Sequence, residues 1–114
     1  MEEKKYPTMI YKDFDDEEIK VNLTAGRYTN NTLYLGIVDV EDGELYADLT
    51  VNLRDSFLTN ANYLDTNNSK YVEEFMTKYK LGEFTGIMSR SGFCEYPLYH
   101  FDLDEIQKYC NINE

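Results

Sequence analysis

Carboxylates form the densest groups of reactive side chains in this sequence. One cluster places five acidic residues in six positions, and a second lies around a glycine; they are Asp13, Asp15, Asp16, Glu17 and Glu18, and Asp39, Glu41, Asp42 and Glu44. Grouped carboxylates can bind a cation, share a proton in catalysis, or replace phosphates on a basic partner. Both clusters fall on predicted hairpin loops, outside the apolar surroundings that acid–base catalysis needs. We therefore expect them to be solvated.

The segment from Asp39 to Glu44 superficially resembles a calcium-binding loop. Its glycine, Gly43, comes fifth, whereas the EF-hand loop needs glycine sixth, ligands at positions 1, 3 and 5, and glutamate at position 12. The alternating pattern on both sides predicts strands where the EF-hand needs helices. An acidic hairpin turn is favoured, and no metal site or cofactor is predicted.

Cys94 and His100 could form a nucleophile and its base. Six residues of extended strand span about 20 Å, which is beyond hydrogen-bond reach unless the Tyr96-Pro97 step folds the chain back. The chain has a single histidine, so acid–base or zinc chemistry has few candidates. We expect a packed cysteine and an edge histidine, no catalytic residues, and no enzyme.

Ser89-Arg90-Ser91-Gly92 combines small residues and an arginine that could cradle an anion. It lacks the glycine and lysine spacing of a P-loop, so a plain turn is the favoured interpretation. The 11 tyrosines allow two roles: most pack at the margins of the core, and an exposed few serve as interface anchors.

The charge and composition restrict the class of partner. With 22 acidic and 11 basic residues, the net charge of −11 disfavours direct nucleic-acid binding and favours a basic protein partner. A hydrophobic content of 42% predicts a folded chain, and 114 residues predict one domain, 1–114. Two cysteines, with no signal peptide or membrane-spanning run, favour the cytoplasm. Oligomeric state stays open.

The strongest helix pattern predicts a helix over residues 69–81. Apolar residues recur along one face, at Tyr71, Val72, Phe75, Met76 and Tyr79. Asn67, Asn68 and Ser69 are suitable N-cap residues, and Gly82 suits the left-handed position after the helix. We expect Phe75 and Met76 to pack against Leu35, Leu49 and Val51.

Segments 32–39 and 44–53 form the clearest predicted hairpin. A two-residue turn would send the apolar residues of the two strands to opposite faces. A three-residue loop, Glu41-Asp42-Gly43, instead pairs Leu35 with Leu49 and Leu33 with Val51, and places Gly43 at a left-handed bulge position. The buried face of the second strand would then carry Leu45, Ala47, Leu49, Val51 and Leu53.

Shorter signals complete the fold. We predict strands at 8–12, 19–24 and 96–101, with Pro97 near an end or edge and Leu98 facing away from Tyr99 and Phe101. We predict a polar connector at 54–62, which Phe57 and Leu58 hold to the edge of the core. We also predict loops at 84–86 and 89–92, on either side of a short strand at 87–88. Asp102 or Asp104 should cap a last short helix. The expected class is α+β: one antiparallel sheet of four to six strands covered by the main helix.

From Tyr63 onward the sequence resembles a small family of uncharacterised proteins carried on mobile genetic elements of Gram-positive bacteria. The resemblance rests on Leu64-Asp65-Thr66-Asn67-Asn68, Glu74-Phe75, Leu81-Gly82-Glu83, Thr85-Gly86, Arg90-Ser91-Gly92-Phe93-Cys94 and Tyr96-Pro97-Leu98-Tyr99. It covers about the last 40 residues closely and the preceding sheet by pattern. In size, acidity and composition the chain is also similar to type II anti-CRISPR proteins, which inhibit Cas9.

That resemblance implies an inhibitor that binds a basic nucleic-acid-handling defence protein, with Cas9 as the first candidate, and blocks its guide RNA or DNA. Alternate residues on a strand lie about 6.6 Å apart, comparable to neighbouring phosphates, and Asp13 with Asp15, and Asp39 with Glu41, have that spacing in sequence. No binding residue transfers from the resemblance itself. The alternatives are solubilising loops and an accessory protein of the mobile element without nucleic-acid mimicry.

Overall fold

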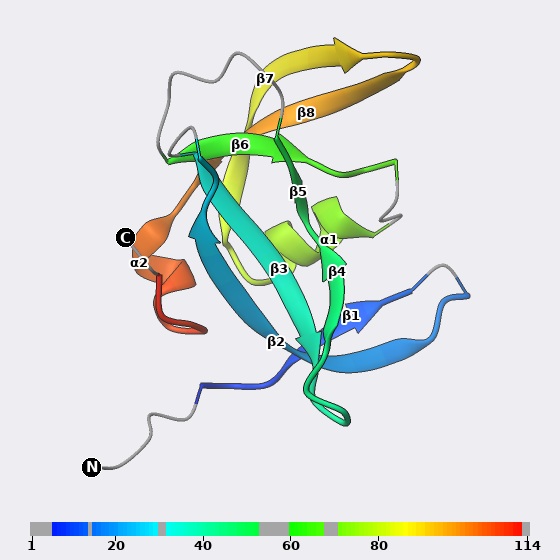
Figure 1. The fold of residues 1–114 in the computed structure, drawn as a ribbon, viewed down its shortest axis with the longest axis vertical. Helices are drawn as coiled ribbons and strands as arrows, with labels where there is room; N and C mark the ends of the chain where they lie inside the picture. Colours follow the sequence, from blue (N-terminus) through cyan, green and yellow to red (C-terminus); the bar gives the residue numbers. More distant parts are fainter. Residues whose placement is uncertain (1–5, 14, 30–31, 53–59, 68–70, 113–114) are drawn as a thin grey trace.

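The computed structural model describes residues 6–13, 15–29, 32–52, 60–67 and 71–112. Antiparallel β-structure dominates and two short helices accompany it, which confirms the α+β class in outline (Figure 1). In chain order the elements are β1 (Met9–Lys12), β2 (Glu18–Arg27), β3 (Leu33–Asp39), β4 (Leu45–Asp48), β5 (Thr50–Val51), β6 (Ala61–Leu64), α1 (Val72–Lys78), β7 (Gly82–Ser91), β8 (Cys94–Phe101) and α2 (Leu103–Ile106). The roles predicted for Leu53, Phe57, Leu58, Asn68 and Ser69 lie outside the described residues.

The strands form two four-stranded sheets, and the prediction of one sheet was wrong. The strand orders are β1-β2-β3-β4 and β5-β6-β8-β7. The predicted strand 44–53 serves both sheets, because it pairs with β3 as β4, bends at Leu49, and pairs with β6 as β5. Leu49 donates its N–H to the Leu35 carbonyl at 2.8 Å and accepts from the Asp65 N–H at 2.9 Å. One continuous segment thereby covers two sides of the core.

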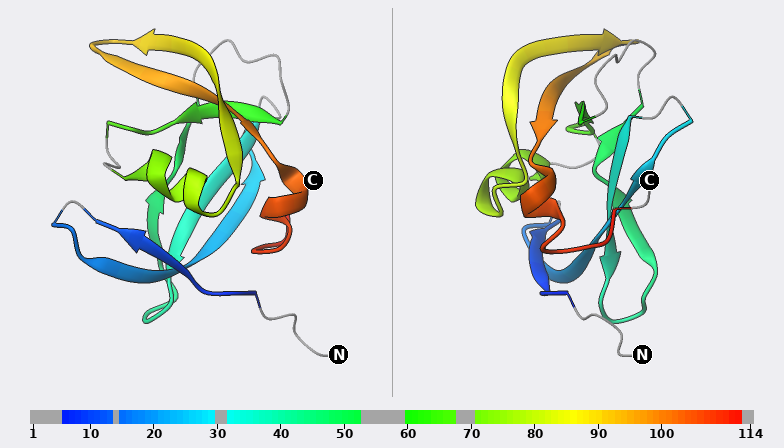
Figure 2. Two further views of the ribbon diagram at one scale, coloured as in Figure 1. Left: turned by 180° about the vertical axis from the view of Figure 1, so that it is seen from behind. Right: turned by 90° about the vertical axis from the view of Figure 1, so that its left-hand side faces the viewer.

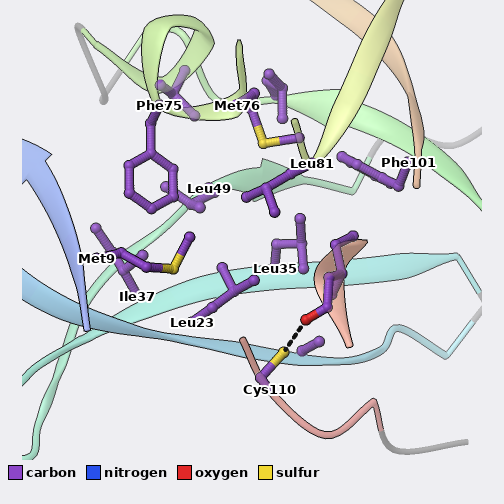
Figure 3. Close-up of a cluster of buried hydrophobic side chains, with 14 of the residues drawn as sticks. Met9, Leu23, Leu35, Ile37, Leu49, Phe75, Met76, Leu81, Phe101 and Cys110 are labelled. Atoms are coloured by element: carbon purple, nitrogen blue, oxygen red, sulfur yellow. Dashed lines mark hydrogen bonds between the residues drawn. The ribbon is translucent and has the colours of Figure 1, made fainter. Parts of the chain in front are cut away.

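The main core lies between the two sheets and α1 (Figure 3). Phe75 and Met76 share this cluster with Leu35 and Leu49, as predicted. The prediction for Val51 was wrong. Val51 pairs with Tyr63 of β6 and packs in a second cluster formed by Ala61, Tyr63, Tyr96 and Leu98.

The body of the β3–β4 hairpin has the predicted register. Ile37 lies opposite Ala47, and Leu35 is bonded to Leu49. The turn, however, is one residue longer than predicted, because the Asp39 N–H donates to the Glu44 carbonyl at 2.9 Å and closes a four-residue loop, 40–43. Gly43 takes the left-handed conformation as expected, with φ of 73°.

The longer loop displaces the bulge into β4. Leu45 lies opposite Val38 and Ala47 opposite Ile37, so Tyr46 is the additional residue that restores the register. Leu45 and Tyr46 are 55% and 41% exposed. Leu45 is therefore not part of the buried face on which the sequence pattern placed it.

Helix α1 is shorter than the predicted 69–81. Its N-cap residue, Tyr71, makes no side-chain capping bond, and its buried residues are Val72, Phe75 and Met76. Lys80, not Gly82, takes the left-handed position, with φ of 57°. The Leu81 N–H donates to the Met76 carbonyl at 3.0 Å and Lys80 N–H to that of Thr77 at 3.3 Å, which is a Schellman ending.

Gly82 belongs to β7, at a position where the neighbouring strand leaves no room for a side chain. A Cβ there would lie 2.7 Å from the His100 carbonyl oxygen of β8. Residues 82–91 form one long strand, so the loops predicted at 84–86 and 89–92 were wrong. Gly92, with φ of 64°, and Phe93 make the two-residue turn into β8, as expected for a type II′ hairpin.

Pro97 lies inside β8, which is an inner strand, and not at an end or edge. The neighbouring strand, β7, accommodates this proline with an irregular pairing. Residues 85–87 of β7 bulge between the Phe84–Tyr99 and Met88–Pro97 pairs, and the Thr85 hydroxyl donates to the Leu98 carbonyl at 2.9 Å. Leu98 belongs to the second cluster, and Tyr99 and Phe101 belong to the main core, which confirms their predicted opposite facing.

The last helix matches its prediction. The Asp102 side chain caps α2 by accepting from the Glu105 N–H at 3.2 Å. Ile106 is fully buried, and Leu103 and Tyr109 pack on the core. Cys110 follows in the core, where its thiol donates to the Ile106 carbonyl (Figure 3).

Candidate partner-binding surface

Two acidic loops leave the first sheet at the same end. The β1–β2 loop carries the cluster from Asp13 to Glu18, and the β3–β4 loop carries the cluster from Asp39 to Glu44. Lys12 lies opposite Glu18, and Asp39 lies opposite Val21, so the antiparallel strands turn at one end of the sheet. The curved sheet sends the two loops apart, to the right and to the bottom of Figure 1. We call them the acidic loops.

The β1–β2 loop is organised by Asp13. Its Oδ1 accepts from the N–H groups of Asp15 and Glu17, both at 2.9 Å. Asp16 has φ of 63°, and the Tyr71 hydroxyl donates to its carboxylate, which fixes the loop to the start of α1. The exposed residues of this loop include Asp15 and Glu17.

The β3–β4 loop repeats this arrangement. Asp39 Oδ1 accepts from the Glu41 N–H at 2.8 Å, and Asp42 Oδ1 accepts from the Glu44 N–H at 2.9 Å. The expectation that Asp13 with Asp15, and Asp39 with Glu41, keep the spacing of an extended strand was therefore wrong. Aspartates bond to backbone two residues ahead and form turns.

The acidic loops thus contain two kinds of carboxylate. Asp13, Asp39 and Asp42 shape the turns through bonds to their own backbone. Glu41 and Glu44 are exposed, and the hydrogen bonds that organise their loop use their backbone groups only. The sequence pattern did not distinguish these two roles.

Tyr46, the bulge residue of β4, connects the two loops electrostatically. Partial burial raises its pKa, and the charges of Asp13, Asp15 and Asp39 raise it further. Carboxylates from both loops therefore act on one hydroxyl. Its ring lies against that of Tyr11 in an edge-on contact, with centroids 6.1 Å apart. The alternating sequence pattern does not single out Tyr46, because only the displaced bulge brings it to this place.

The other candidate residues do not assemble into a chemical site. Cys94 and His100 lie near opposite ends of β8, and the Tyr96-Pro97 step continues the strand. Residues 89–92, for which an anion cradle was the less favoured interpretation, are part of β7 and its turn. There the Ser89 hydroxyl bonds to the Tyr63 hydroxyl at 2.9 Å, and Arg90 pairs with Glu95 at 3.7 Å.

Among the residues that the structure describes, no three His, Cys, Asp or Glu side chains lie close enough to hold a metal ion. Within the same part of the chain, every helix is too short or too polar to cross a bilayer.

Comparison with known proteins places the chain in a family. The profile of one family matches residues 19–113, which is most of the sequence, and is described as a domain of unknown function, DUF4313. The chain belongs to the DUF4313 family. No curated protein and no solved structure matches it. The DUF4313 match contains the whole β3–β4 loop and begins after the acidic residues 13–18 of the β1–β2 loop.

Proposed function

We propose that this DUF4313 protein is a non-enzymatic inhibitor that binds a basic, nucleic-acid-handling defence protein through its acidic loops. Cas9 is the first target to test, and the proposed effect is to keep guide RNA or DNA out of a basic channel. The proposed place of action is the cytoplasm of a bacterial host. The resemblance to proteins of mobile elements and to anti-CRISPR proteins motivates the choice of target.

The observation that carries the proposal is that two acidic loops leave the same end of one sheet. Asp13 and Asp15 from one loop and Asp39 from the other act on the same Tyr46 hydroxyl. Ion pairs such as Arg90–Glu95 and Lys108–Glu105 lie on other elements. A surface of this sign attracts the lysine and arginine side chains that line nucleic-acid channels.

The exposed glutamates are the proposed contact residues. Asp39 and Asp42 hold the turn, so they present Glu41 and Glu44 outward on a short, closed loop. A loop that is already ordered loses less conformational freedom on binding than a flexible one. We therefore assign partner contact to Glu41 and Glu44, with Asp15, Glu17 and Glu18 as the second group.

The test is charge reversal at the contact residues with the turn left intact. We expect Glu41→Lys with Glu44→Lys to weaken binding to guide-free Cas9 by tenfold or more, because like charges at an interface cost several kcal/mol. The matched control, Glu74→Lys with Glu95→Lys, changes the charge equally on α1 and β8. Binding by biolayer interferometry and plasmid interference in cells are the readouts.

Equal inhibition by the loop variant and the parent would exclude the β3–β4 loop and direct the same test to Asp15, Glu17 and Glu18. Equal loss in the loop variant and the control would show that net charge alone matters. If the parent binds neither guide-free nor guide-loaded Cas9, this target is wrong, and the accessory role in the mobile element becomes the better hypothesis.

A further inference from the structure

Several large apolar side chains of the β7–β8 hairpin are exposed. Phe84, Ile87, Met88 and Phe93 are 47%, 53%, 47% and 105% exposed. Phe84 lies opposite Tyr99 and Met88 opposite Pro97, so both project from the same face of the ribbon. Figure 2 shows this hairpin reaching beyond the rest of the fold. Exposed apolar residues concentrated on one element mark an interaction surface.

A cleft of about 1010 Å³ opens at the foot of this hairpin. The beginning of β7, the end of β8, the end of α1 and the beginning of α2 form its walls. This volume suits a short peptide segment or a small ligand. Residues 103–105 of α2 line the cleft. Helix α2 lies on the other side of the molecule from the β1–β2 loop in Figure 1 and in the left view of Figure 2.

The lining of the cleft combines an aromatic platform with negative charge. The Phe84 ring stacks on Tyr99, with centroids 5.8 Å apart and planes inclined by 29°. Tyr99 is itself held by a 2.7 Å hydrogen bond to Glu73. The lining also includes four acidic residues and one lysine, which are Glu83, Asp102, Asp104, Glu105 and Lys80.

This combination of groups suits a guanidinium group. Arginine stacks on aromatic faces and bonds to carboxylates in its own plane, and it is more weakly hydrated than lysine. Two carboxylates of the lining have other roles, because Asp102 caps α2 and Glu105 pairs with Lys108 at 2.8 Å. Glu83 and Asp104 are exposed and remain as the charges for a ligand.

We propose that the cleft and the adjoining face of β7–β8 bind an extended basic segment of a partner protein. The carboxylates of Glu83 and Asp104 pair with basic side chains of that segment. One of its arginines stacks on Phe84, and an apolar side chain covers Met88. The charge of the cleft and the apolar strip beside it select this occupant. The inference does not depend on the acidic loops, which lie on different elements.

The probe is a fluorescein-labelled hexapeptide of alternating arginine and leucine, titrated into the full chain and followed by anisotropy. A hexapeptide of alternating glutamate and leucine is the control ligand. Two-dimensional amide NMR of the full chain locates the binding site. We expect saturable binding of the arginine peptide only, with shifts concentrated at Glu83, Phe84 and Asp104.

Three variants separate the contributions. Phe84→Leu keeps an apolar side chain without the aromatic face, and should weaken binding by about two- to fivefold. Glu83→Gln with Asp104→Asn should weaken it by about fivefold. The matched control, Asp48→Asn with Glu74→Gln, removes the same charge from β4 and α1, outside both the cleft and the acidic loops, and should change the affinity less than twofold. Thermal unfolding verifies that each variant is folded.

Equal weakening by the cleft variant and the control would overturn the proposal, because net charge would then explain the binding. Shifts confined to the acidic loops, or equal binding of both hexapeptides, would also overturn it. Neither result affects the Cas9 test of the acidic loops. Conversely, loss of Cas9 binding on reversing Glu41 and Glu44 says nothing against the cleft.

Discussion

At the scale of single residues, aspartates and glutamates of the acidic loops have different structural roles. An aspartate side chain is short enough to accept from backbone N–H groups two residues ahead, as Asp13, Asp39 and Asp42 do. A glutamate has one more methylene and projects further from the chain. Turn formation and charge presentation are therefore divided between the two residue types, and substitutions should separate them.

The first prediction concerns Asp39. Replacing it with alanine removes the acceptor for the Glu41 N–H and should lower the free energy of unfolding by about 1 kcal/mol. Asparagine retains the side-chain oxygen, so Asp39→Asn should lose less than half as much although it removes the same charge. Urea unfolding of the three proteins measures this. Equal destabilisation by both substitutions would mean that charge, and not the turn, is what Asp39 contributes.

Tyrosine hydroxyls form a second group of residue-scale contacts, because several donate to carboxylates from another element. Tyr34 bonds to Asp48 at 2.6 Å and Tyr99 bonds to Glu73 at 2.7 Å. Burial raises the pKa of both tyrosines, and the hydrogen bond and the carboxylate charge raise it further. These hydroxyls therefore keep their protons in the folded state at pH values where free tyrosine ionises.

The second prediction follows from the sign of that shift. The folded pKa lies above the unfolded value of about 10, so the stabilisation is complete below pH 10 and is lost as the pH rises further. The free energy of unfolding should fall from about pH 10 upward. Tyr99→Phe should show a shallower fall over the same range. Urea titrations at pH 8, 9.5 and 11 decide the matter, and parallel curves for parent and variant would contradict it.

At the scale of elements, α1 is held by packing and by its ending more than by its own propensity. Seven residues are too few for a helix that is stable alone, and its N-cap residue makes no side-chain bond. The Schellman ending places Leu81 and Met76 together in the core, and both are fully buried. The left-handed residue of this ending is a lysine, although glycine is the residue that suits it best.

The third prediction is that Lys80→Gly stabilises the protein. A left-handed conformation costs an L-residue about 1–2 kcal/mol, which exceeds the added unfolded-state entropy of glycine, so we expect a gain of about 0.5–1 kcal/mol. Lys78→Gly is the control, because it removes the same charge and side chain type from inside α1. That variant should lose about 1 kcal/mol. A loss in both variants would mean that the Lys80 side chain itself contributes to stability.

At the scale of the whole molecule, the charge of −11 affects encounter with a basic partner more than the lifetime of the complex. Attraction over long range accelerates association, and at physiological ionic strength it is screened over about 8 Å. In the proposed complex, Glu41 and Glu44 would form their short contacts after the encounter. Salt should therefore act mainly on the association rate.

The fourth prediction concerns the rates of association with and dissociation from a basic partner. Raising salt should slow association with guide-free Cas9 several-fold and change dissociation less. Pre-loading Cas9 with guide RNA should prevent binding, because phosphates and carboxylates would compete for the same basic side chains. Stopped-flow rates across a salt series, with and without RNA, are the measurements. Salt-independent association, together with equal binding to both forms, would reject phosphate mimicry.

Several features followed from the sequence because local chemistry specifies them. The Ile37–Ala47 register follows from alternating apolar residues, the left-handed Gly43 from its place in a turn, and the Asp102 cap from its position before Leu103. The placement of the acidic clusters on solvated hairpin loops was also predictable. In each case the interactions that decide the structure join residues close together in the chain.

Other features were decided by contacts between segments far apart. Residues 44–53 read as one strand, but the bonds of Leu49 to Leu35 and Asp65 bend it into two sheets. Strand β7 lies at the edge of its sheet and pairs with one neighbour only, so its sequence does not need a regular alternation of polar and apolar residues. Its mixed polarity therefore led to the prediction of loops. The Gly92-Phe93 pair could have indicated the hairpin.

The candidate sites divide in the same way. Counting carboxylates located the acidic loops, since clustered charge is a property of composition and turn chemistry. Only the folded chain brings Tyr46 within electrostatic influence of carboxylates from both loops and stacks Phe84 on Tyr99 beside a cleft. The first arrangement depends on a displaced bulge and the second on the pairing of two strand residues that lie 15 positions apart. Packing in three dimensions decides both, and a local sequence pattern does not encode that packing.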